Sequence, residues 1–98
     1  IESDTDGELV NWNNVFELIN TLYAGFYDKL QASYGELLSP KEKQIIVLMV
    51  AGFSTKEISV ITGQTTSTIY VRKSSIRKKL GVPEKEDIVK FLREKTSD

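Results

Sequence analysis

Two Ser-x-x-Glu sequences in the middle of the chain fix where helices begin. Ser39 and Ser54 are each followed, three residues later, by a glutamate. In such a capping box the serine hydroxyl accepts a hydrogen bond from an amide of the first turn, and the glutamate carboxylate accepts one from the serine amide. Pro40 has the fixed φ that suits the first position of the earlier helix. The pattern therefore predicts a helix that begins after Ser39 and stops at Gly52, and a short helix over 55–61.

The segment after these helices carries conflicting local signals. Five of its first seven residues are β-branched, and such residues favour strands. An alternating strand would leave neither face consistently apolar, whereas Ile69, Ile76 and Leu80 fall on one stripe of a helix. The sequence therefore predicts a helix over about 65–81, with Thr65 as its N-cap.

Two further helical regions flank this centre. A last helix is expected over 84–94, with Ile88, Phe91 and Leu92 facing inward. Near the N-terminus, a stripe of apolar and aromatic residues at three- and four-residue steps predicts two helices, over 11–20 and 22–34. The stripe consists of Trp12, Phe16, Ile19, Tyr23, Phe26, Tyr27, Leu30 and Tyr34. We interpret it as core, in preference to the wall of a ligand pocket.

These elements predict an all-α protein with three parts. Residues 1–10 are acidic and nearly free of large apolar side chains, so they are expected to form a mobile linker. Residues 11–37 form a helical extension made of one or two amphipathic helices. Residues 38–95 form a compact domain of four helices.

The composition argues against several functional classes. The chain contains no cysteine and no histidine, which removes the commonest metal ligands and the commonest general base. We therefore expect no enzyme activity, no cofactor and no metal. The longest apolar run, over 45–52, is too short to cross a bilayer. The chain begins with Ile1, and we expect it to be a fragment of a longer protein with an upstream sensor domain. We expect this part to be cytoplasmic, even if the full-length protein is anchored to a membrane.

The charges are distributed unevenly along the chain. Residues 1–40 hold seven acidic side chains against one lysine, whereas residues 41–98 hold twelve cations against seven acids.

A short capped helix, a turn with glycine and a longer basic helix form the pattern of a helix-turn-helix, whose second helix enters the major groove of DNA. The second helix should then face the bases with small or polar side chains and the phosphates with cations. The candidate base-facing residues are Thr66, Ser67, Tyr70, Val71 and Ser74. The candidate phosphate-facing residues are Lys56, Arg72, Lys73, Arg77, Lys78 and Lys79. Tyr70 has an alternative role, in which its ring packs partly against the preceding helix.

Several blocks of this sequence agree, in order, with one known family. They are Leu38-Ser39-Pro40 with Glu42, the run from Ala51 to Ile58 (AGFSTKEI), and Thr68, Ile69, Ile76 with the ending Lys79 to Val82 (KLGV). Over roughly residues 38–94 the chain resembles the LuxR-type (GerE-like) helix-turn-helix domain of bacterial transcription regulators. The segment before Leu38 resembles, more loosely, the aromatic helical pair that precedes this domain in a subset of regulators from Bacteroidetes.

The resemblance implies roles for individual residues. The positions of Tyr70, Val71 and Ser74 commonly contact bases in the family, and those of Lys56 and the basic run contact the DNA backbone. Many relatives have Lys at the position of Tyr70 and His at the position of Arg72, so the resemblance does not carry over the DNA sequence that is read.

The expected function is sequence-specific binding of double-stranded DNA as the effector domain of a transcription regulator. A homodimer on paired half-sites is expected, because one small domain contacts few bases. RNA polymerase is a further possible partner. Two alternatives stay open at this stage: a promoter-binding module like sigma-factor region four, and a protein-interaction module without DNA binding, in which the basic helix is merely solvated.

Overall fold

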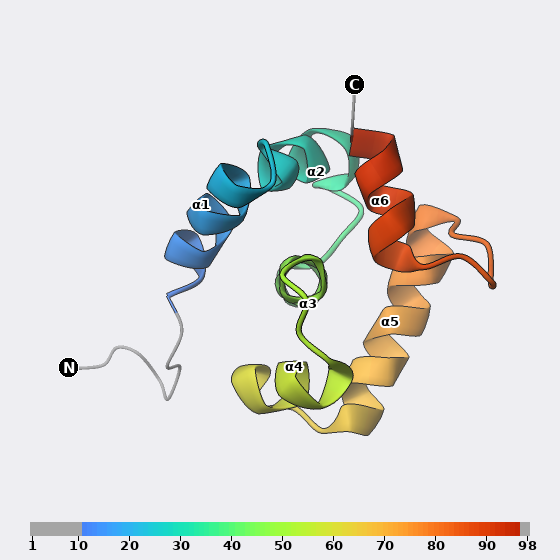
Figure 1. The fold of residues 1–98 in the computed structure, drawn as a ribbon. Helices are drawn as coiled ribbons and strands as arrows, with labels where there is room; N and C mark the ends of the chain where they lie inside the picture. The colour runs from blue at the N-terminus through green and yellow to red at the C-terminus, as the bar shows by residue number, and fades with distance from the viewer. Residues whose placement is uncertain (1–10, 97–98) are drawn as a thin grey trace.

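The computed structural model describes residues 11–96, and this part of the chain consists of helices without strands. The six helices are α1 (Trp12–Leu22), α2 (Phe26–Tyr34), α3 (Pro40–Val50), α4 (Thr55–Thr62), α5 (Thr66–Leu80) and α6 (Ile88–Thr96). In Figure 1 α3 is seen end-on at the centre, with the other helices around it. The helix α3 contacts α1, α4, α5 and α6, while α2 packs against α1 and α6. The predicted all-α fold is confirmed; the predicted linker over 1–10 lies outside the described residues.

The predicted helix starts are confirmed where the sequence contains capping residues. At α3 the Ser39 amide donates to Glu42 Oε1 at 2.8 Å, and the Glu42 amide donates to Ser39 Oγ at 3.2 Å. The same pair of bonds joins Ser54 and Glu57 at the start of α4, at 2.8 and 3.1 Å. The β-branched segment that follows is helical from Thr66 onward, with Thr65 as its N-cap, as the spacing of its buried residues predicts.

Three predicted helix ends differ from the structure. The helix α1 ends two residues later than predicted and α2 begins four residues later, so that they meet at a corner over 23–25, where Ala24 and Gly25 have φ of +55° and +77°. The last helix begins at Ile88 and not at residue 84. The residues before it form a turn, and the side chain of Asp87 accepts a hydrogen bond from the Lys90 amide at 3.0 Å. Asp87 therefore acts as the cap that starts α6.

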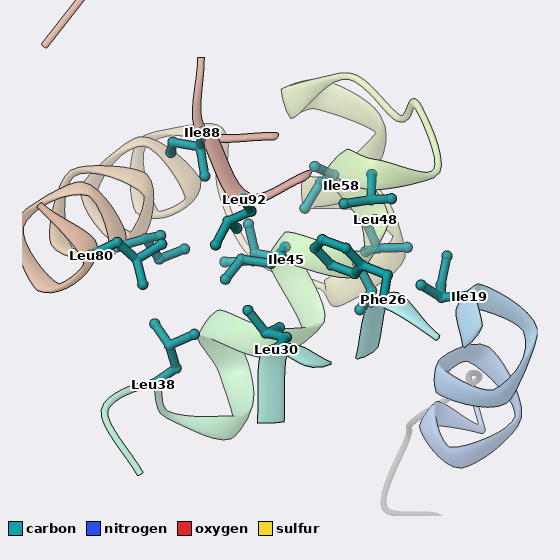
Figure 2. Packing of buried hydrophobic residues seen from close by; sticks show 14 of the residues in the cluster. Ile19, Phe26, Leu30, Leu38, Ile45, Leu48, Ile58, Leu80, Ile88 and Leu92 are labelled. Carbon is teal, nitrogen blue, oxygen red and sulfur yellow. The ribbon is translucent and has the colours of Figure 1, made fainter. Parts of the chain in front are cut away.

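One hydrophobic core joins the N-terminal helices to the rest of the chain. Ile19, Phe26 and Leu30 belong to the same buried cluster as Ile45 and Leu92, and Figure 2 shows these side chains converging on the space around α3. The aromatic residues Trp12, Phe16, Tyr23, Tyr27 and Tyr34 are partly buried against this cluster, which confirms their predicted role in packing. The extension over 11–37 is thus packed as part of the same folded unit.

The predicted inner residues of the last four helices are mostly confirmed. Ile58, Ile69 and Ile76 are fully buried, and the other buried members are Leu80, Ile88 and Leu92. Phe91 is only half-buried. Since the inner stripe of α5 is apolar and covered, its orientation against the core is fixed, and so is the face that it turns outward.

Candidate nucleic-acid interface

The helices α4 and α5 and the turn between them form a helix-turn-helix. The helix α4 ends at Gly63, which has a left-handed φ of +70° that glycine adopts without steric cost. The Gln64 amide then donates to the carbonyl of Ser59 at 3.0 Å. Thr65 caps α5, and its hydroxyl accepts a hydrogen bond from the Thr68 amide at 3.1 Å. The turn is therefore held at both ends, and it sets the position of α5 against α4.

The outward face of α5 carries the predicted base-facing side chains. Ser67 and Ser74 are exposed, as is Thr66 at the start of the helix. Tyr70 and Val71 lie between the two serines, with 61% and 68% of their surface exposed. The ring of Tyr70 is therefore not packed into the core. All five predicted side chains are accessible from solvent, and their contact with DNA remains a prediction.

Two of the predicted phosphate-facing cations form hydrogen bonds with residues of α4 and of the turn that follows it. Arg72 Nε donates to Gln64 Oε1 at 2.8 Å. Lys73 Nζ donates to Thr55 Oγ1, in the first turn of α4, at 2.7 Å. Both cations are half-buried. These bonds fasten α5 to the turn and to the start of α4.

Two more cations of α5 bind other parts of the fold. Arg77 Nη1 donates to the carbonyls of Pro83 and Glu86, at 3.0 and 2.7 Å, and so holds the turn before α6. Lys79 Nζ lies 2.8 Å from Glu42 Oε1 and forms an ion pair with it. Ser75 Oγ donates to the other carboxylate oxygen of Glu42 at 3.0 Å.

Lys56 and Lys78 are the predicted phosphate contacts that stay unengaged. Both are exposed, and neither side chain has a hydrogen-bond or ion-pair partner within residues 11–96. Lys56 lies in the first turn of α4, and Lys78 lies in the last turn of α5. They offer two free charges near opposite ends of the motif.

The buried carboxylate of Glu42 is kept charged by its partners. Burial alone would raise its pKa, but hydrogen bonds from Lys79, the Ser39 amide and Ser75, together with the charge of Lys79, lower the pKa below its ordinary value. For Lys73 the largest influence is burial, which lowers its pKa; the charge of Asp87 opposes this shift and that of Arg77 adds to it.

Sequence reasoning missed the acceptors that engage these cations. Thr55, Gln64 and Glu42 lie 18, 8 and 37 positions from the cations that they bind. No spacing rule links such positions, because the pairs exist only once α3, α4 and α5 are packed. The Nε2 atom of Gln64 is also buried, and it has no acceptor among the described residues.

The described residues hold no group of three or more acidic, histidine or cysteine side chains that could bind a metal ion. Within the same part of the chain, no helix is long and apolar enough to cross a membrane.

A comparison with known protein families identifies the family to which this helix-turn-helix belongs. The model of the family described as bacterial regulatory proteins, luxR family, matches residues 36–92. The chain belongs to this LuxR family. Its LuxR segment covers α3 to α5 and most of α6, and it leaves α1 and α2 outside the match. The family resemblance predicted from the sequence is thus confirmed.

A curated relative is similar over about half of the chain. It is the transcriptional regulatory protein MctR of Rhizobium johnstonii, 35% identical over 54 residues. The alignment covers 55% of this chain and 25% of the relative, so the chain matches about a quarter of that protein's length. No solved structure matches the chain.

Proposed function

We propose that this chain binds double-stranded DNA in a sequence-dependent way, as the effector module of a bacterial transcription regulator, with α5 in the major groove. The observation that carries the proposal is the outward face of α5. It presents small hydroxyls and two larger side chains in the middle, with an exposed cation at its C-terminal end. A helix of this width fits the major groove, where such side chains reach base edges. Membership of the LuxR family and the name of the relative support the same function.

We propose that two groups of cations in the motif contact phosphates. Lys56 and Lys78, which are unengaged, bind phosphates on either side of the groove. Arg72, Lys73, Arg77 and Lys79 add further contacts. An ammonium has three N–H donors and a guanidinium has five, so each of these cations keeps donors for a phosphate while its internal bond persists. The internal bonds hold these side chains in place before DNA arrives, which lowers the entropy lost on binding.

We further propose that two copies bind paired half-sites. The helix α6 is one candidate dimer surface, since Val89 and Phe91 on it are only half-buried. The helices α1 and α2 are the other candidate. RNA polymerase and an upstream sensor domain are proposed partners of the full-length protein.

Salt dependence of binding tests the proposal. The affinity of the whole chain for a labelled pool of random duplexes should fall steeply as salt rises, because cations on the protein displace counterions from the phosphates. The slope of log affinity against log salt should correspond to about four to eight phosphate contacts per dimer. If the chain fails to bind duplex DNA at low salt, the proposal is wrong.

A further inference from the structure

The outward face of α5 lacks the side chains that usually read guanine or adenine. Guanine is read mostly by arginine or lysine at O6 and N7, and adenine by asparagine or glutamine at N6 and N7. Between Ser67 and Ser74 this face offers only hydroxyls, the Val71 methyls and the Tyr70 ring. The exposed and unengaged cation of α5, Lys78, lies a turn further on, towards the end of the helix.

The neighbouring cations and amide are held by contacts within the protein, on the α4 side of the motif. Arg72 is bound through Nε to Gln64, and Lys73 is bound to Thr55 on α4. Gln64 itself has its oxygen on Arg72 and its amide nitrogen buried. Lys73 Nζ also lies 5.9 Å from the centre of the Tyr70 ring, within range of a cation–π contact. The groups suited to reading guanine or adenine thus lie on the flanks of α5, held towards the turn and the start of α4, and the donors that they keep remain for the phosphates proposed above.

What remains in the centre of the face is apolar surface. Val71 and Tyr70 are both more than half exposed, at 68% and 61%. In the major groove the thymine C5-methyl is the group that an apolar side chain recognises. Resting on the DNA-binding function proposed above, we propose that Val71 and the ring of Tyr70 read thymine methyl groups, and that the preferred site carries thymine where α5 crosses the groove.

The test compares duplexes that differ only at the methyl position. A site is first enriched from a random duplex pool by binding to the whole chain. The enriched duplex is then synthesised with thymine, with deoxyuridine, which lacks the methyl group, and with 5-bromodeoxyuridine, whose bromine has about the size of a methyl group. Each removal of a methyl group that the protein touches should weaken binding about fourfold. The bromo form should restore most of the affinity.

Two valine variants test whether α5 is responsible for the preference for thymine over deoxyuridine. Val71→Ala should lower the ratio of thymine to deoxyuridine affinity towards one, and the preference that remains is the part read by the ring of Tyr70. Val60→Ala is the matched control, because Val60 is similarly exposed (74%) but lies on α4. It should leave the ratio unchanged. Circular dichroism of both variants checks that they remain folded.

The outcomes separate this inference from the proposed function. If no duplex is enriched, sequence-dependent DNA binding is wrong, and the inference falls with it. If a site is enriched but the deoxyuridine form binds as tightly as the thymine form, DNA binding stands and methyl reading by α5 is wrong. A Val71→Ala ratio equal to that of the unmodified chain would also overturn the inference.

Discussion

Glu42 at the start of α3 accepts a hydrogen bond of 2.8 Å from the ammonium of Lys79 in the last turn of α5. Glu42 is only 3% exposed, and the same carboxylate completes the capping box of α3. One side chain thus starts the central helix and fastens the C-terminal end of the candidate DNA-binding helix to it.

Removing the cation of this pair should destabilise the fold. Lys79→Ala leaves a buried carboxylate without its counter-charge, and we expect a loss of about 1–3 kcal/mol in the free energy of unfolding, reduced by water that reaches the partly exposed lysine site. Lys78→Ala is the control, since its exposed ammonium has no partner among the described residues; its effect should stay within about 0.5 kcal/mol. Urea unfolding followed by circular dichroism measures both. Equal losses in the two variants would contradict the structural role of the pair.

The same carboxylate should make stability depend on pH in the acid range. Its pKa in the folded chain is lowered from the ordinary value of 4.5, so the unfolded chain binds the proton more readily. The stabilisation is therefore fully present above about pH 4.5 and is lost as the pH falls through the folded pKa. Glu42→Gln cannot titrate at this position, so its free energy of unfolding should fall less steeply below that pH. Identical pH profiles for the two proteins would show that Glu42 does not contribute.

The helix α5 should be weak outside the protein. Its first residues are β-branched, and short helices are marginal in water even with favourable sequences. Burial of Ile69 and Ile76 stabilises the helix in the folded chain. A peptide of residues 65–82 should therefore be mostly disordered by circular dichroism. A strongly helical peptide would mean that local propensity, and not packing, forms α5.

The sequence was most informative where a local rule decides the structure. The capping boxes at Ser39 and Ser54 and the buried stripe of Ile69 and Ile76 could be predicted, because each depends on residues within a few turns of one helix. The start of α6 was placed too early because Pro83 and the acidic residues after it resemble a helix start. In the folded chain, Arg77 instead binds the carbonyls of this segment and holds it as a turn.

The candidate site was predictable as a surface but not as a set of contacts. The exposure of Tyr70 and Val71 follows from helical periodicity. The engagement of Arg72 by Gln64 and of Lys73 by Thr55 requires the packed arrangement of α4 and α5. The positions of the charges in the sequence therefore do not show that several cations of α5 form hydrogen bonds within the protein.

Variants of α5 should fall into two groups if its faces have different roles. Lys78→Ala removes a phosphate contact, so it should weaken binding to all DNA sequences similarly and reduce the salt slope by about one for each bound copy. Ser74→Ala and Tyr70→Ala should instead change which sequence is preferred. Selection from a random duplex pool, with each variant and with the unmodified chain, measures the preference. If all three variants kept the same preference, the proposed division of the helix would be wrong.

The central claim is that the outward face of α5 is the surface that meets DNA. Amide chemical shifts of the isotope-labelled chain, recorded while an enriched duplex is added, test it residue by residue. The account predicts that the largest changes occur from the turn at Gly63 to the outward residues of α5 and near Lys56. Large changes confined to α1, α2 or α6, with α5 unaffected, would contradict it.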